Sequence, residues 1–257
     1  MLTGRGMFIW KLGPVVDAEM GPDRLAEKAA RARLSSVWIK LTVGTSQHAN
    51  VSDARFGVVL EALRERGVGI WGWSEPRCAT TVRAKEEAEV ALRLVRKHGL
   101  DGLLMDAERA EGGNFFQGGP EQAAAYASAL RKGLDADGKG LAICSHDIPQ
   151  NFTPFPFASF AASAHVNAPQ VYYGSSPSVE HRLTRAIKAN ADVELPFIPV
   201  GAAWIGSGGG CASASAVVER AGVFMDLVRK KGFPGYSFWH WGGAPLVFWK
   251  LLFDTPV

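Results

Sequence analysis

The sequence contains little cysteine, with only Cys78, Cys144 and Cys211 among 257 residues. These three residues lie far apart and form no Cys-x-x-Cys pair. So sparse and odd a set argues against a disulfide framework and against a structural zinc site. The fold therefore depends on a hydrophobic core, for which a chain of this length with 47% hydrophobic residues has ample material.

Long apolar runs and a strong charge are also missing. No apolar segment reaches the ~20 residues of a membrane span, and the net charge of +3 is far from the dense basic stripe of a nucleic-acid binder. We expect neither a membrane nor a nucleic-acid partner, and a monomer or weak oligomer. The first six residues lack the apolar segment of a signal peptide, which predicts a cytoplasmic protein, or one released or exported by another route.

Short apolar segments alternate with amphipathic ones along the whole chain. The alternation of strand and helix predicts a parallel sheet. About eight such units in this length predict an α/β fold, a (β/α)₈ TIM barrel forming a single domain over residues 1–257. The expected strands are 7–12, 36–41, 68–73, 103–105, 141–144, 169–173, 197–200 and 236–241, and the expected helices are 24–33, 56–66, 84–97, 120–132, 179–190, 213–231 and 247–253. Residues 149–164 show no clean helical pattern.

Two acidic residues, Asp106 and Glu108, follow the fourth expected strand. Side chains two residues apart in a strand point to the same face, so these carboxyl groups emerge together. In a TIM barrel the carboxyl ends of the strands form the active-site face. A pair of acids at this position is suited to general acid and base chemistry.

Aromatic, acidic and amide side chains are concentrated at the other strand ends. Flat apolar faces with nearby hydrogen-bonding groups are what a carbohydrate cleft requires. The candidate substrate-binding residues are Lys40, Trp73, His146, Asp147, Gln170, Tyr172, Trp239 and Trp241, and Glu75 is a candidate third catalytic residue beside Asp106 and Glu108.

Residues 101–108, Asp-Gly-Leu-Leu-Met-Asp-Ala-Glu, resemble the Asp-Gly-x-x-x-Asp-x-Glu end of the fourth strand in family-18-type chitinases. Residues 170–172 and 235–239 are similar to their sixth-strand Met/Gln-x-Tyr and eighth-strand Gly-x-x-x-Trp. The resemblance extends to the wider group of barrel glycosidases, which includes lysozyme-like muramidases. It implies that Glu108 is the proton donor and that Asp106 orients a substrate N-acetyl group, which itself attacks the anomeric carbon.

Two positions depart from the pattern of that family. Leu104 occupies the place of a further Asp, and residues 71–75, Trp-Gly-Trp-Ser-Glu, replace the third-strand Ser-x-Gly-Gly. Non-catalytic relatives lose acids from this motif, so the substitution at Leu104 keeps a purely carbohydrate-binding barrel in consideration.

Each candidate also has an interpretation without catalysis. Glu108 could pair with a neighbouring cation, and Asp106 could be a buried hydrogen-bonded carboxylate rather than an orienting group, nucleophile or modulator of Glu108. Glu75 could be the second catalytic carboxylate or an ion-pair partner of Arg77 or Lys40. Tyr172 and Gln170 could contact an intermediate or belong to the core. If the last strand stays regular, Trp239 and Trp241 share one face, where one floors a sugar subsite and the other packs, and His240 is a packed histidine.

A metal site is the remaining interpretation of His146 and Asp147 beside the two acids. Metal-dependent barrels usually carry His-x-His on the first strand, and residues 7–12 contain no histidine, so we expect no metal and no cofactor. The glycine-rich residues 206–210 match no phosphate-binding fingerprint and are expected to form a flexible loop.

The sequence therefore predicts a glycoside hydrolase that cleaves a polysaccharide or oligosaccharide, with an N-acetylated substrate such as peptidoglycan or chitin. Glu108 is the expected general acid. The alternatives are a barrel that binds carbohydrate without cleaving it and an unrelated metal-dependent barrel hydrolase.

Overall fold

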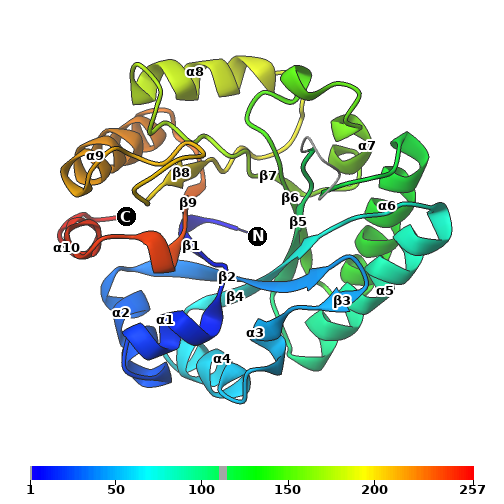
Figure 1. The fold of residues 1–257 in the computed structure, drawn as a ribbon, viewed down its shortest axis with the longest axis horizontal. Coiled ribbons are helices and arrows are strands. Elements are labelled where there is room, and N and C mark those ends of the chain that lie inside the picture. Colours follow the sequence, from blue (N-terminus) through cyan, green and yellow to red (C-terminus); the bar gives the residue numbers. More distant parts are fainter. Residues whose placement is uncertain (1, 110–114) are drawn as a thin grey trace.

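The computed structural model describes residues 2–109 and 115–257. Its parallel strands form one sheet in the order β7-β6-β5-β4-β2-β1-β9-β8, with the short β3 antiparallel to β2. Bridges from Asn167 to Phe197 and from Gln170 to Val200 join the two ends of this sheet and close the barrel (Figure 1). The strands are β1 Gly4–Ile9, β2 Leu34–Val43, β3 Ser46–Gln47, β4 Gly69–Glu75, β5 Gly102–Asp106, β6 Gly140–Cys144, β7 Val166–Asn167, β8 Val200–Ala202 and β9 Gly235–Trp239.

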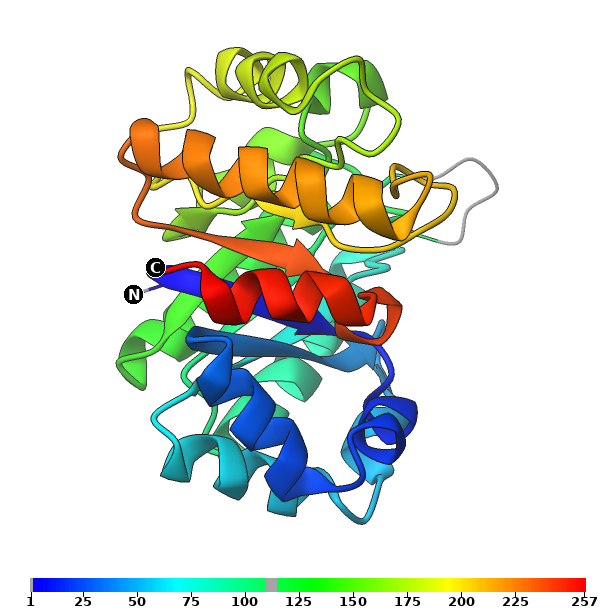
Figure 2. The same ribbon diagram turned by 90° about the vertical axis from the view of Figure 1, so that its left-hand side faces the viewer.

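Helices surround the barrel on the outside and alternate with the strands, which confirms the predicted TIM-barrel fold (Figure 1). Helix α10 returns the chain along the barrel wall, so that the C-terminus lies beside the start of β1 (Figure 2). The helices are α1 Leu12–Ala18, α2 Pro22–Arg31, α3 Ala49–Ser52, α4 Phe56–Glu65, α5 Thr81–Lys97, α6 Pro120–Ala136, α7 Phe157–Ala161, α8 Val179–Ala189, α9 Ala214–Lys230 and α10 Leu246–Asp254, with 3₁₀ turns η1 Pro149–Phe152 and η2 Trp241–Gly243.

Hydroxyl side chains begin three of these helices. The Oγ atoms of Ser178 and Ser213 accept hydrogen bonds from the backbone N–H groups three residues on, and Thr80 does the same at α5. Such bonds satisfy N–H groups that the first helical turn leaves unpaired. The starts of α5, α8 and α9 are therefore encoded locally.

Two of the expected strands differ clearly from the structure. The strand expected at 7–12 ends at Ile9, because Leu12 already begins α1. The strand expected at 169–173 is wrong: β7 lies at Val166–Asn167, and Gln170 makes only single bridges. Pro169 has no N–H to donate to a neighbouring strand, which interrupts the ladder there. In the segment without a clean pattern, α7 is a helix of one turn and a half.

Strand β5 shows how the barrel separates its two faces. Leu103 and Met105 pack outward against the helices, whereas Leu104 belongs to the apolar cluster inside the barrel. Side chains alternate along a strand, so Gly102, Leu104 and Asp106 all point inward. The strand is buried on both faces, as expected of a parallel sheet covered by helices.

Large aromatic rings fill the barrel interior. The ring of Phe8 lies edge-on to Trp38 at 4.7 Å and to Trp239 at 5.3 Å between centroids. Trp71 fills the opposite end, where a Cβ atom on Gly102 or Gly140 would approach its ring to 2.6 or 2.4 Å. Glycine at these two positions therefore makes room for an indole. The interior is solid, and a ligand has access only at its rim.

In the described ranges, no helix is both long and apolar enough to span a membrane.

Candidate active site

Asp106 and Glu108, here called the acid pair, lie where β5 ends inside the barrel mouth. Asp106 is the last residue of the strand and is almost fully buried, whereas Glu108 is partly exposed. Ala107 between them packs outward in the main core. The alternation of β5 thus continues past its last strand residue and directs both carboxyl groups to the same side.

Gln170 connects the two carboxyl groups. Its Nε2 donates to Asp106 Oδ1 at 3.1 Å and to Glu108 Oε1 at 2.6 Å. Gln170 is itself held in place by its backbone, which donates to Ser145 O and forms bridges to His146 and Val200. The amide therefore fixes the separation and orientation of the acid pair.

Asp106 gives up its proton less readily than an ordinary carboxyl group. Burial raises the pKa of Asp106 well above its usual range, and the nearby charge and hydrogen bond of Glu108 raise it further. Lys40 opposes this shift without reversing it. Two carboxyl groups that share a buried site cannot both ionise readily, so a proton remains on the pair at a pH where separate acids would have lost theirs.

Tyr172 faces the acid pair from the segment that follows β7. Burial raises the pKa of its hydroxyl well above the usual range, and Cys144, Glu108 and Asp106 add to the shift. The phenol thus stays protonated and can donate a hydrogen bond. Its ring lies edge-on to Trp204 at 5.0 Å.

The end of the glycine-rich segment 206–210 packs against this tyrosine. A Cβ atom on Gly209 would lie 2.6 Å from the Tyr172 Cβ, and the Gly174 N–H donates to Gly209 O. The segment is pinned further by the bond from Cys211 N to Trp204 O. Residues 206–208 of the expected loop are exposed, whereas Gly209 supports Tyr172, because a glycine allows the backbone to approach the side chain closely.

Trp239 closes the interior at the rim. Its ring is partly exposed and lies 5.7 Å from Trp73, which is 1% exposed. Trp239 can therefore present a face to a sugar. The expectation that Trp73 binds substrate is wrong, because Trp239, Phe8 and the Lys40 ammonium, 4.6 Å above its ring, cover it.

Glu75 is surrounded by cations and does not belong to the acid pair. Its two oxygens lie 2.6 Å from Lys40 Nζ and 3.0 Å from Arg77 Nη2. Glu75, Lys40 and Arg77 are here called the Glu75 cluster, in which the two cations compensate the carboxylate. We therefore correct the catalytic role expected for Glu75, since a carboxylate held between two cations is neither a proton donor nor a free nucleophile. Lys40 is nearly buried and bound to Glu75, so it acts on the site through its charge.

His146 and Asp147 have different surroundings, and only His146 lies beside the acid pair. The His146 ring stacks on Phe152, its Nε2 accepts a hydrogen bond from Arg109 N, and burial lowers its pKa against the opposing charge of Glu108. The neutral imidazole ring of His146 thus lies beside the acid pair. Asp147 is buried, and its Oδ1 accepts a hydrogen bond of 2.7 Å from Arg182 Nη2. The substrate contact expected for Asp147 is therefore wrong, because its carboxylate holds α8 to the barrel.

Trp241 lies outside the barrel interior. Strand β9 ends at Trp239, the peptide bond to His240 is cis, and η2 then turns Trp241 onto Trp249 at 4.5 Å. The shared face expected for Trp239 and Trp241 is therefore wrong, because the strand does not continue. Trp241 is the packed member of the two.

Two aromatic residues of the rim were not among the candidates. Trp204 supports Tyr172, and Trp10 is 40% exposed directly after β1, 6.3 Å from Trp239. The only signal was an aromatic residue near a strand end: Trp10 falls within the strand expected at 7–12, and Trp204 lies four residues past the strand expected at 197–200. Among the described residues, no group of three or more histidine, cysteine and acidic side chains is placed to hold a metal ion.

The two remaining positions of the 101–108 motif have structural roles. Asp101 lies at the far end of β5, where its Oδ2 accepts a hydrogen bond of 2.6 Å from Ile70 N. Leu104 is fully buried in the interior cluster with Trp73. An unpaired carboxylate would be costly in this apolar setting, so the barrel interior itself disfavours an acid at position 104.

Comparisons with known proteins agree on the fold. No family model and no curated protein matches the sequence. Solved structures do match: a GH18 chitinase from Cycas revoluta in complex with (GlcNAc)₃, at 12% identity and TM-score 0.68, covers 97% of this chain and 98% of its own. The spore cortex-lytic enzyme SleL of Bacillus cereus, at 11% and 0.67, covers 97% and 73%. A GH18 chitinase from Pseudoalteromonas aurantia, at 10% and 0.61, covers 93% and 94%.

Proposed function

We propose that this protein is a glycoside hydrolase that cleaves an N-acetylated polysaccharide of the chitin or peptidoglycan type, with Glu108 as general acid. The observation that carries the proposal is the acid pair joined by Gln170 at the barrel mouth. The fold supports it, since solved structures of chitinases and of a cortex-lytic enzyme share the architecture. The Cycas revoluta enzyme is in complex with an N-acetylglucosamine trimer.

The proton of the acid pair supplies the first step. Glu108 is the member of the pair that reaches the partly exposed mouth, whereas Asp106 is buried behind it. Glu108 transfers the proton to the glycosidic oxygen as the bond from that oxygen to the anomeric carbon breaks. Both carboxyl groups of the pair are then ionised, with Glu108 available as a base and Asp106 as a hydrogen-bond acceptor.

The carbon left behind needs a nucleophile on its other face. Glu75 is compensated by Lys40 and Arg77, and Asp106 lies on the same strand end as Glu108. The substrate acetamide is therefore the nucleophile: its oxygen forms a bond to the anomeric carbon while Asp106 accepts from its N–H and the Tyr172 hydroxyl donates to it. Water, deprotonated by the Glu108 carboxylate, opens this intermediate and restores the proton.

Hydrolysis of N-acetylglucosamine oligosaccharides and of peptidoglycan by wild type and Glu108→Gln tests the proposal. We expect new reducing ends from wild type and a rate about 10²–10⁴-fold lower for the variant, because it cannot give up a proton. Glu65→Gln, an exposed change on α4, is the matched control and should retain full activity. Equal rates for wild type and Glu108→Gln would contradict the proposal.

The stereochemistry of the product tests the nucleophile separately. Attack by the acetamide and then by water inverts the anomeric carbon twice, so the product retains its configuration. Proton NMR of the product during the first minutes distinguishes the two anomers. An inverted product would exclude the acetamide mechanism while leaving Glu108 as the acid.

A non-catalytic carbohydrate-binding barrel is the second candidate, and Leu104 is the observation that favours it. In that case wild type would bind the oligosaccharides and produce no reducing ends. The same assay therefore decides between the two functions.

A further inference from the structure

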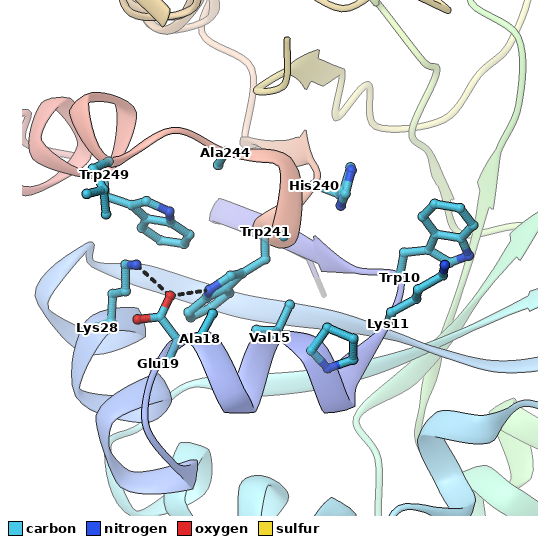
Figure 3. Close-up of a pocket in the computed structure, with 13 residues that line it drawn as sticks. Trp10, Lys11, Val15, Ala18, Glu19, Lys28, His240, Trp241, Ala244 and Trp249 are labelled. Carbon is cyan, nitrogen blue, oxygen red and sulfur yellow. Dashed lines mark hydrogen bonds and ion pairs between the residues drawn. The ribbon is translucent and has the colours of Figure 1, made fainter. Parts of the chain in front are cut away.

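A pocket of about 350 Å³ lies on the outer side of the rim, next to the acid-pair site and separate from it. It is enclosed by the loop after β1, helices α1 and α2, and the η2–α10 segment (Figure 3). Its volume falls at the lower end of the range of roughly 300–1,000 Å³ for small-molecule sites. We call it the Trp10 pocket, and its polar and aromatic lining is Trp10, Lys11, Glu19, Lys28, His240, Trp241 and Trp249.

The inner wall of the Trp10 pocket is rigid and aromatic. Trp241 and Trp249 are almost fully buried with their rings 4.5 Å apart. Glu19 Oε1 accepts a hydrogen bond of 2.9 Å from Trp241 Nε1 and pairs with Lys28, whose Nζ lies 4.5 Å from the Trp249 ring centre. This network fixes the indoles and neutralises Lys28, so the inner wall is a rigid support without a free charge, and its two rings expose almost no surface (Figure 3).

The outer wall carries one uncompensated cation. Lys11 Nζ lies 4.6 Å above the exposed Trp10 ring, and within the described ranges no carboxylate pairs with it. Burial lowers the pKa of His240, which is therefore a neutral donor and acceptor rather than a second cation. The accessible lining thus combines one exposed indole, that of Trp10, with one positive charge.

The Trp10 pocket is continuous with the catalytic rim. The Trp10 ring lies 6.3 Å from Trp239 and 6.1 Å from His240. A saccharide chain that lies on Trp239 meets Trp10 next, and beyond it the pocket. The aromatic surface thus leads outward from the acid pair.

We infer that the Trp10 pocket binds a sugar ring with a carboxylate substituent, the ring against the exposed Trp10 indole and the carboxylate on Lys11. The inference rests on the proposed function in so far as this ring belongs to the glycan that the enzyme cleaves. It deepens that function, because an acidic glycan such as one containing muramic acid fits the pocket better than neutral chitin. A lactyl ether and a uronic acid supply the same carboxylate chemistry.

Binding of monosaccharides tests the site without relying on hydrolysis, since they contain no glycosidic bond to break. NMR titrations that follow the Trp10 indole N–H would use N-acetylmuramic acid, its methyl ester, glucuronic acid and N-acetylglucosamine. We expect at least one acid to bind about five- to tenfold more tightly than the neutral sugars. Preference for N-acetylmuramic acid assigns a lactyl carboxylate, and preference for glucuronic acid assigns a uronate.

Variants of Lys11 locate the effect. Lys11→Met keeps the stem on Trp10 and should remove the preference for the acid, and Lys11→Arg should restore most of it. Lys85→Met, an exposed change on α5, is the matched control and should leave binding unchanged. Equal binding of acids and neutral sugars, or a preference that survives Lys11→Met, would overturn the inference even if Glu108 proves to be the catalytic acid.

Hydrolysis kinetics give the readout on the glycan itself. For an oligosaccharide that contains muramic acid, Lys11→Met should raise KM about fivefold with kcat within about twofold, and a chitin oligosaccharide should show neither change. An equal rise in KM for both substrates would contradict recognition of the carboxylate.

Discussion

Two carboxylate clusters on neighbouring strands of the same rim have opposite electrostatics. In the Glu75 cluster, the carboxylate lies between two cations at 2.6 and 3.0 Å. In the acid pair, the hydrogen-bond donor is a neutral amide, and burial together with the second acid raises the pKa of Asp106. Glu75 and Asp106 are both nearly buried, so burial alone does not distinguish the two clusters. The partner decides: a cation stabilises the charged form, whereas a second acid holds a proton that chemistry can use.

The largest expected effect is on the stability of the protein, and it distinguishes the two clusters. Glu75→Gln leaves the nearly buried Lys40 without a carboxylate, and we expect it to lower the free energy of unfolding by about 3 kcal/mol. Urea unfolding of wild type, Glu75→Gln and Glu108→Gln measures this, and Glu108→Gln should stay within about 0.5 kcal/mol of wild type. If the Glu75→Gln protein is fully stable but inactive, Glu75 has a catalytic role after all.

Removal of the titrating oxygen from Asp106 should reduce catalysis without harming the fold. Asn resembles protonated Asp in shape and can still donate to Glu108, but it cannot take up the negative charge after proton transfer. We therefore expect Asp106→Asn to lower kcat about 100-fold. Steady-state kinetics on an N-acetylglucosamine oligosaccharide measure it, and activity within threefold of wild type would exclude Asp106 from the mechanism.

The amide between the two acids should matter less than the acids themselves. Gln170→Met keeps the length of the side chain and removes the donor 2.6 Å from Glu108. Loss of the hydrogen bonds to both acids, of which the one to Glu108 is the shorter, predicts a fall in kcat/KM of about tenfold. Gln150→Met is the control, because Gln150 is exposed and donates to Ala189 O away from the rim. An unchanged pH profile with full activity would show that the acid pair positions itself.

The smallest effect is a pH dependence of stability. The folded-state pKa of Asp106 lies above its unfolded value. Ionisation of this carboxyl group therefore lowers the free energy of unfolding increasingly as the pH rises from about 4 through the folded pKa. Asp106→Asn removes this cost. The thermal midpoint of Asp106→Asn should therefore rise relative to that of wild type as the pH increases from 5 to 8. Each kcal/mol of unfolding free energy corresponds to a difference of about 2–4 °C. A difference between the two proteins that does not vary with pH would contradict the raised pKa.

Much of the fold follows from local patterns. The amphipathic segment 84–97 is helical within α5, and the expected helix 213–231 matches α9 to a residue at each end. Segments whose structure depends on strands that are distant in the sequence were harder to predict. Residues 166–173 cannot form a regular ladder past Pro169, and only contacts with β6 and with residues near β8 show where the strand lies.

The acid pair illustrates what the sequence by itself determined. The alternation of a strand is a local property, so spacing alone places Asp106 and Glu108 on one side, and the strand-and-helix order places them at the mouth of a barrel. The resemblance of residues 101–108 to a chitinase motif is likewise visible in the sequence.

Only the tertiary structure decided which of the candidate side chains face the same space and which are compensated. Lys40 and Glu75 meet across two strands, Gln170 reaches the acid pair across more than 60 residues, and η2 turns Trp241 away from Trp239. Charge compensation and burial depend on distances between atoms from different strands, and a sequence pattern contains no such distances. For that reason the sequence could name Glu75 and Glu108 alike, and the folded barrel separates them.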